Sequence, residues 1–255
     1  MIRSPLESMS VWARVSRFLS TYRSDEGPLI LIYNMGKVGS TAVESGFNRA
    51  VHTHTLYGFP PCSEYYKQKF GKAGCFFRKH LVDPLRRFLL KRNKEVYIIS
   101  FYRDPTARNI SMFMQDLPYW MSSYSRKHSG SSREEGYGVL VRSFIEEFPH
   151  EYPEQWVEKE LGRLTGLSPE TLSLGIENYK IINQNQFKIF IGRNEKMDEC
   201  IEPLVEHFGM NKETINKNSN RGDEKWYADV YAKFRENVQG SPVPCCEKFK
   251  VRNGY

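Results

Sequence analysis

The sequence has no run of apolar residues long enough to cross a membrane. A transmembrane helix needs about 20 consecutive apolar residues, and no stretch of the 255-residue chain approaches that length. The first residues, MIRSPLESMSVWARVSRFLSTYRSDEG, are interrupted by charges too often to form the core of a signal peptide. We therefore expect a chain that stays in the cytoplasm.

Cysteine is scarce and unpatterned. The five cysteines are an odd number and include no C-x-x-C pair. This usage suits a reducing compartment better than a disulfide framework, and it gives no sign of a zinc site. We expect neither a disulfide scaffold nor a bound metal.

The positive charge of the chain is not gathered into one arm or stripe. The formal net charge of +7 and the pI near 9.1 favour anionic partners, such as a phosphorylated cofactor, an acidic glycan, a nucleic acid or a lipid head group. Dense basic stripes with interleaved aromatics, as in polynucleotide-binding modules, are missing, so we expect no nucleic-acid partner. A solvated basic surface explains the charge as well as an anion groove does.

The first 27 residues predict an amphipathic helical segment ahead of one domain that spans residues 28–255. The apolar stripe of this helix would carry Trp12, Val15, Phe18 and Leu19, with Arg14 and Arg17 opposite. Such a stripe fits peripheral contact with a membrane surface or packing against the chain's own domain. We favour packing.

Alternating strand and helix patterns predict the fold. Strands are expected at Leu29–Tyr33, Ala50–Thr55, Val96–Tyr102 and Phe187–Ile191. Helices are expected at Thr41–Asn48, Asp83–Arg92, Pro105–Asp116, Val139–Glu147, Pro153–Leu161, Met197–Phe208 and Glu224–Glu236. This alternation predicts a single three-layer α/β domain with a central parallel sheet, in which the apolar strands LILIY and VYIISFY lie at the centre.

Residues 117–138 interrupt this alternation. The segment is rich in Ser, Gly and aromatic residues and shows no clear period. It predicts a long loop, which could serve as a lid or binding loop or could be a disordered insertion.

The segment LILIYNMGKVGSTAVESGF has the pattern of a phosphate-binding loop between a strand and a helix. The predicted contacts to the anion come from Gly36, Lys37, Val38, Gly39, Ser40 and Thr41. Glycines let the backbone approach an anion closely, while the lysine and the hydroxyls add a charge and donors. The Walker order is not met, because Lys37 precedes the second glycine, which argues against an ordinary ATPase or GTPase. The alternative is a tight turn with an exposed lysine.

A second anion-binding pattern follows the strand VYIISFY. Arg103 lies at the predicted end of this strand, and Ser111 follows eight positions later on the next helix. The two side chains could hold one phosphate, because ligands of open α/β sheets bind at the carboxyl ends of the strands. The alternative is that Arg103 pairs with Asp104 or Glu44 and that Ser111 faces a neighbour.

Together the two segments resemble the sulfotransferases that use 3′-phosphoadenosine 5′-phosphosulfate (PAPS), whose hallmarks here are GKVGST and Arg103 with Ser111. The motif RDP resembles that of the glycan and membrane-associated members of this family. The motif GKVGST resembles that of bacterial members associated with capsular polysaccharide synthesis. The resemblance implies a P-loop-like sulfotransferase fold, PAPS as the sulfuryl donor, no metal, and a hydroxyl or amine on an unidentified acceptor. It also implies that Lys37 meets the charge that develops on the leaving phosphate.

The resemblance further implies a catalytic histidine ahead of the strand that ends in Arg103. In the segment Arg78–Leu81, His80 lies 23 positions before Arg103, close to the spacing of the family. An imidazole can accept the acceptor's proton near neutral pH. We rank His80 first and His54, at the end of the second predicted strand, second; Glu44 and Asp83 are the carboxylates to consider if neither histidine acts.

Arg221 is a further cofactor ligand that the resemblance implies, in the segment NKNSNRGDEKWYADVY. This segment is similar to the basic, glycine-containing loop that closes over the 3′-phosphate and adenine in some members. Two other functions stay open: a P-loop-like kinase of a small metabolite, for which Asp104 is the candidate magnesium ligand, and a non-enzymatic module that binds polyanions.

Overall fold

The computed structural model describes residues 27–58, 82–91, 94–127, 137–215, 227–239 and 247–255. The helix expected within residues 1–27, the candidate base His80 and the candidate cofactor ligand Arg221 lie outside these ranges and stay predictions.

A five-stranded sheet forms the centre of the molecule, in the order β2-β1-β3-β5-β4. Its strands are β1 (Leu29–Tyr33), β2 (Ala50–Thr53), β3 (Val96–Tyr102), β4 (Tyr179–Gln184) and β5 (Phe187–Arg193). Four strands run parallel, as predicted, and β1 and β3 lie inside the sheet as their apolar sequences require. The edge strand β4 was not predicted and pairs antiparallel with β5. Its sequence YKIINQ is half-exposed throughout, so it lacks the apolar signal of a buried strand.

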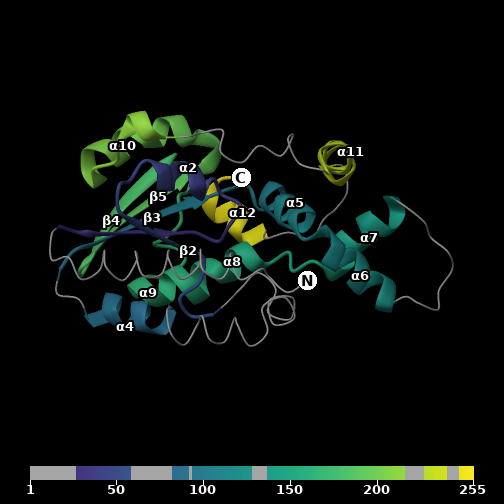
Figure 1. Cartoon of the computed structure of the whole chain (residues 1–255), viewed down its shortest axis with the longest axis horizontal. Coiled ribbons are helices and arrows are strands. Elements are labelled where there is room, and N and C mark those ends of the chain that lie inside the picture. Colours follow the sequence, from purple (N-terminus) through teal and green to yellow (C-terminus); the bar gives the residue numbers. More distant parts are fainter. Residues whose placement is uncertain (1–26, 59–81, 92–93, 128–136, 216–226, 240–246) are drawn as a thin grey trace, which may run out of the picture.

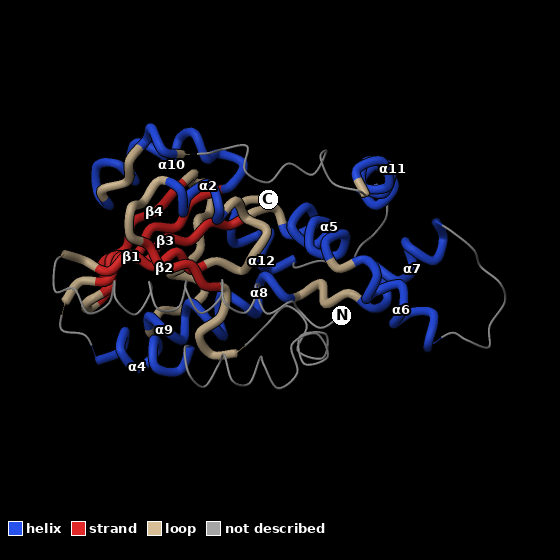
Figure 2. Tube along the Cα trace, in the orientation of Figure 1, coloured by secondary structure: helices blue, strands red, loops and turns tan. Residues whose placement is uncertain are grey.

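Helices lie on both sides of this sheet (Figure 1), so the chain has the expected α/β architecture. The helical elements are α2 (Ser40–Ser45), α4 (Asp83–Lys91), α5 (Pro105–Gln115), α6 (Leu117–Lys127), α7 (Tyr137–Glu147), α8 (Tyr152–Trp156), the π-helix η2 (Val157–Gly162), α9 (Arg163–Thr165), the 3-10 turns η3 (Asn194–Lys196) and η4 (Lys212–Thr214), α10 (Met197–Phe208), α11 (Ala228–Gln239) and α12 (Glu247–Asn253). In Figure 2, α2 and α10 cover one face of the sheet, and α4, α8 and α9 cover the other. Within the described ranges, no helix is both long and apolar enough to cross a membrane.

Two groups of buried side chains stabilise the fold. The larger one surrounds the sheet and contains most of the residues of β1, β3 and β5. The smaller one joins α5, α6, α7 and α11 around Phe113, which stacks on Phe234 with ring centroids 5.6 Å apart. Because α5 contributes to this second group and also leaves β3 beside the β1 loop, it connects the sheet to the peripheral helices.

The prediction of a loop over residues 117–138 was wrong for its first half. Residues Leu117–Lys127 form helix α6, whereas 128–136 lie outside the described residues. Trp120 and Tyr124 are buried on one side of α6, and Trp120 packs on Phe113. The aromatic residues that suggested a binding loop instead form a helical stripe at i and i+4 spacing, which packing against α5 stabilises.

Candidate anion-binding site

The loop Asn34–Gly39 leaves β1 at the carboxyl edge of the sheet and leads directly into α2. Three of its residues adopt left-handed backbone conformations: φ is 81° at Gly36, 63° at Lys37 and 76° at Gly39. Glycine adopts this conformation without strain, but lysine does so at a cost. The strain at Lys37 must therefore be offset by contacts that fix the loop, and strained residues of this kind cluster at ligand sites.

The backbone N–H groups of this loop are available to a ligand. Within the described ranges, no protein acceptor receives the N–H groups of Gly36, Val38, Gly39, Ser40 and Thr41. A chain that alternates in handedness turns successive amides toward one point and forms a concave anion site, often called a nest. The loop therefore has the donors that an anion requires.

The carbonyl oxygens of the same loop are held from behind by two arginines. Arg108 is completely buried and donates from Nε to the Gly36 carbonyl at 3.3 Å and from Nη2 to the Met35 carbonyl at 3.0 Å. Arg103 is half-buried and donates from Nη1 to the Lys37 carbonyl at 3.1 Å. These bonds fix the loop through its carbonyl oxygens.

Helix α5 presents Ser111 on the face that borders this loop. Arg108 and Gln115 both contact the loop, since Gln115 Oε1 accepts from Lys37 Nζ at 2.9 Å. Ser111 lies three positions after Arg108 and four before Gln115, and residues at these spacings share one side of a helix. The structure thus brings the predicted residues of both motifs to one place on the sheet edge.

The connection between β5 and α10 closes one side of the loop. An added Cβ atom at Gly39 would lie 2.4 Å from Asn194 Oδ1 and 3.2 Å from the terminal methyl of Met197. Gly39 is therefore required twice, for its left-handed backbone and for this close approach.

His54, the second-ranked candidate base, lies beside the loop. Its Nδ1 is 2.9 Å from the carbonyl oxygen of Asn34, and an added Cβ atom at Gly36 would lie 3.9 Å from Nδ1. A carbonyl can only accept, so we assign the ring proton to Nδ1, which leaves Nε2 with a free lone pair.

The surroundings of His54 keep its ring neutral. Desolvation by the enclosing protein, followed by the neighbouring His52, lowers the pKa of His54 from 6.5 to about 4, and Arg108 acts in the same direction. The Asn34 carbonyl and Glu44 oppose this change. His54 also keeps solvent-exposed surface, which moderates the loss of solvation. The lowered pKa means that the His54 imidazole is neutral at neutral pH.

Glu44 and Asp104 have other roles than the ion pairs considered for Arg103. Glu44 Oε2 lies 2.8 Å from His52 Nδ1, and the His52 ring stands edge-on to His54 with centroids 4.8 Å apart. Asp104 caps the start of α5 with its side chain. In the part of the chain that is described, Arg103 makes no ion pair with either carboxylate.

Three residues of the site were not predicted from the sequence. Asn34 is fully buried, its Oδ1 accepts from the Phe101 amide at 2.6 Å, and its Nδ2 has no partner among the described residues. Arg108 and Asn194 hold and border the loop. Asn34 and Asn194 each follow directly after an apolar strand, and this signal could have identified them. Arg108 could not be distinguished from a surface arginine, because only the folded chain buries it.

Described residues contain no group of three or more His, Cys, Asp or Glu side chains arranged to hold a metal ion. In comparisons with known proteins, no protein-family model, curated protein or solved structure matches the chain. The case for a function therefore depends on the residues of the site and their geometry.

Proposed function

We propose that this chain is a sulfotransferase with a P-loop-like fold that transfers the sulfuryl group of PAPS to a hydroxyl or amine of its acceptor. The observation that carries the proposal is the contact between its two motifs, Arg103 Nη1 to the Lys37 carbonyl at 3.1 Å, across 66 positions of sequence. A donor with phosphates at both the 5′ and 3′ positions needs two anion sites close together, and this contact supports such a pair.

The loop and Lys37 would bind the 5′-phosphosulfate. The free amides of the loop, together with the Ser40 and Thr41 hydroxyls, are donors that need no metal to bind an anion. Lys37 Nζ donates to a neutral amide, Gln115 Oε1, at 2.9 Å. Exchanging that amide for a phosphate is favourable, because charge-assisted hydrogen bonds are stronger than neutral ones. Lys37 would then stabilise the charge that develops on the leaving phosphate.

Arg103 and Ser111 would bind the 3′-phosphate. Arg103 is half-buried and its contact to the Lys37 carbonyl uses one of its five N–H donors, so a phosphate can accept from others without breaking that contact. Ser111 is half-buried on the α5 face next to the loop. Both groups would thereby order the loop and the nucleotide together.

A base must take the acceptor's proton while the acceptor atom bonds to sulfur and the bond from sulfur to the phosphate oxygen breaks. The products are the sulfated acceptor and adenosine 3′,5′-bisphosphate. His54 is the candidate histidine base within the described residues, since its neutral ring has a free Nε2. A pKa near 4 makes it fully deprotonated at neutral pH but a weaker base than an ordinary histidine. His80 stays the other candidate.

Thermal stabilisation by ligands tests the proposal. Adenosine 3′,5′-bisphosphate should raise the melting temperature in the absence of metal, because a ligand that binds only the folded chain stabilises it. Arg103→Ala should lose this rise, whereas the control Arg235→Ala, an exposed residue of α11, should keep it. If the bisphosphate does not raise the melting temperature but ATP with Mg²⁺ does, the chain is a kinase instead. Stabilisation by heparin alone would indicate a polyanion-binding module. A mass-spectrometric screen of hydroxyl and amine acceptors with PAPS would then measure sulfuryl transfer.

A further inference from the structure

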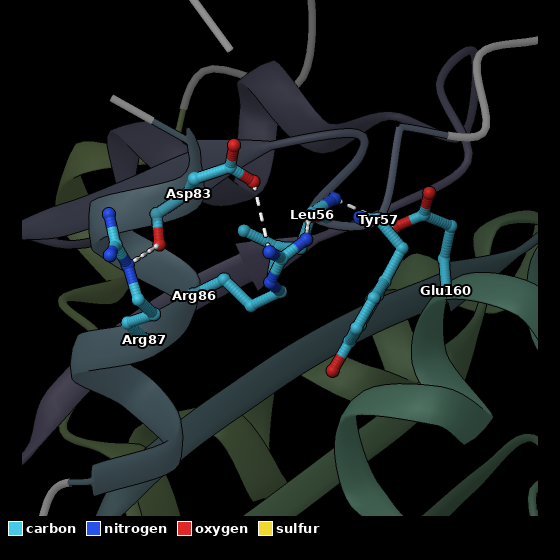
Figure 3. A network of polar contacts seen from close by, with 6 residues as sticks. All are labelled: Leu56, Tyr57, Asp83, Arg86, Arg87 and Glu160. Carbon is cyan, nitrogen blue, oxygen red and sulfur yellow. Dashed lines mark hydrogen bonds and ion pairs between the residues drawn. The ribbon is translucent and has the colours of Figure 1, made fainter. Parts of the chain in front are cut away.

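The backbone just after β2 is fixed by side chains from the helices α4 and η2 (Figure 3). Glu160 Oε2 accepts the N–H groups of Leu56 at 2.7 Å and Tyr57 at 2.9 Å. Arg86 Nη1 donates to the Leu56 carbonyl at 3.1 Å, and its Nη2 pairs with Asp83 at 3.0 Å. The position of residues 56–57 is therefore set by a carboxylate on one side and a guanidinium on the other.

Glu160 is completely buried, although it carries an acidic side chain. Burying a carboxylate costs several kcal/mol unless hydrogen bonds replace its lost hydration. The same oxygen that accepts the two amides also accepts the hydroxyl of Tyr33. Glu160 therefore connects the last residue of β1 with the segment that follows β2.

A second residue, at the end of α8, contacts the same segment. Trp156 directly precedes η2 and donates from Nε1 to the carbonyl of His54 at 2.7 Å. The wider turn is fixed at its end by Gly162, where an added Cβ atom would lie 2.9 Å from the Leu167 carbonyl. Single π-helical turns are frequent at functional sites. Here Trp156 binds the His54 carbonyl, and Glu160 binds the Leu56 amide two residues later.

We propose that Glu160 is a positioning residue that fixes the His54 ring against the Asn34 carbonyl and so keeps the ring proton on Nδ1. Tyr33 immediately precedes Asn34, and Leu56 follows His54 by two positions. Glu160 therefore sets the distance between the donor ring and the acceptor carbonyl from both ends. The use of His54 as a base rests on the proposed function, but its tautomer and pKa can be measured without any reaction.

Histidine nitrogen NMR is the direct test, with His54→Gln to assign the signal. In the wild type, His54 should carry its proton on Nδ1 and titrate near pH 4. In Glu160→Gln, which removes the charge but keeps the shape, the ring should loosen from Asn34. Regained hydration should then raise the His54 pKa toward 6.5, because desolvation is the largest cause of its lowering and outweighs the loss of the Asn34 bond, which by itself lowers the pKa. The two tautomers should mix, because the carbonyl no longer selects a proton on Nδ1. The groups that also act on His54, namely His52, Arg108 and Glu44, are unchanged in this variant.

Glu158→Gln is the matched control, because Glu158 lies on the same π-helix but is exposed. It should leave the His54 signals unchanged. Wild-type His54 signals in a folded Glu160→Gln variant would overturn the proposal. If Glu160→Gln does not fold, Tyr33→Phe removes one of the three donors and should shift the His54 pKa in the same direction by a smaller amount; no shift there would equally overturn it.

Turnover separates this inference from the proposed function. With PAPS, Glu160→Gln should lower kcat by about tenfold while KM for PAPS stays near wild type, because only the base is displaced. A shifted His54 titration without any sulfuryl transfer in the wild type would refute the proposed function and leave the positioning role standing. Transfer that proceeds equally in both proteins, with an unshifted His54, would refute the positioning role alone.

Discussion

The segments that leave β1 and β2 lie side by side at one edge of the sheet, yet the protein holds them by opposite groups. After β1, the carbonyls of Met35, Gly36 and Lys37 accept from two arginines. After β2, the amides of Leu56 and Tyr57 donate to one carboxylate. The peptides after β1 are therefore fixed through their carbonyl oxygens, whereas those after β2 are fixed through their N–H groups.

This difference gives the two segments at the sheet edge different functions. The β1 loop can bind an anion through its backbone, because the N–H groups of Gly36 and of residues 38–41 have no protein acceptor within the described ranges. In the β2 segment the Leu56 and Tyr57 amides bond to Glu160, and the side chain that faces the β1 loop is His54. Changes in the first segment should therefore alter nucleotide binding, and changes in the second should alter turnover.

The largest effect should come from removing the base. If His54 acts, His54→Ala should lower turnover by ~10²–10⁴-fold while the affinity for adenosine 3′,5′-bisphosphate stays near wild type. If His80 acts, as ranked from the sequence, His80→Ala should show this loss instead. Steady-state assays of both variants distinguish them. Full activity in both would leave a carboxylate, Glu44 or Asp83, as the base.

The pH profile of the wild type sharpens this comparison. A base must be deprotonated, so kcat falls as the pH drops through the pKa of the base. That limb should lie near pH 4 for His54, and near ~6.5 for a histidine of ordinary pKa at position 80. A limb that persists unchanged in the inactive variant would contradict the assignment.

The next largest effect should follow from Arg108→Met in the β1 segment. Two loop carbonyls lose their donors, and the ring of Tyr152, 4.6 Å from the guanidinium carbon, loses its cation. We expect a loss of about 3 kcal/mol in the free energy of unfolding, and a fall of about 100-fold in affinity for the bisphosphate. Denaturant unfolding and calorimetric titration measure the two.

Arg163→Met is the control, because its exposed guanidinium also stacks on a tyrosine, Tyr57, at 4.5 Å. It should cost only about 0.5–1 kcal/mol. Equal losses of bisphosphate affinity in the two variants would mean that Arg108 does not hold the loop.

A smaller effect on binding is expected from Gly39→Ala. Gly39 and Gly166 have almost the same left-handed backbone, with φ of 76° and 75°, but an added Cβ atom meets Asn194 only at Gly39. Both changes should cost about 1–2 kcal/mol in backbone strain. Only Gly39→Ala should also weaken bisphosphate binding, by about tenfold, and Asn194→Ala in the same chain should restore part of it. If Gly39→Ala and Gly166→Ala bind the bisphosphate equally well, the close approach of Asn194 to Gly39 does not matter for binding.

The smallest effect should be an acid sensitivity of stability. The folded chain lowers the pKa of His54 from 6.5 to about 4, so the unfolded chain binds the proton more readily. The stability contribution is complete above pH 6.5 and is lost as the pH falls toward 4. Unfolding measured across this range should show a shallower loss in His54→Gln than in wild type or in the control His207→Gln, an exposed residue of α10. Identical profiles in all three would mean that the ring is not desolvated.

Strands and motifs were predictable where local chemistry is strong. The apolar runs of β1 and β3 were placed with their observed bounds, and helix α10 likewise. Edge strand β4 was missed because half-exposed residues carry little pattern, and α6 was taken for loop because its stripe is aromatic rather than aliphatic. Within the site, glycines and Arg103 could be identified by spacing, but the contacts of Asn194 and Arg108 could not, because each joins segments distant in sequence.

The sequence by itself determined which groups are present: an apolar strand, a glycine-rich turn that can reverse handedness, a lysine, and an arginine with a serine eight positions later. Those are local properties, set by side-chain chemistry and by the backbone freedom of glycine. Only the tertiary structure decided whether the carbonyl oxygens or the N–H groups of each segment are bonded to protein side chains. Buried Arg108 fixes carbonyl oxygens of the loop after β1. Buried Glu160 fixes amides of the segment after β2. The physical reason is that buried charges must be satisfied by whatever backbone lies next to them, and that neighbour is set by the packing of the whole chain.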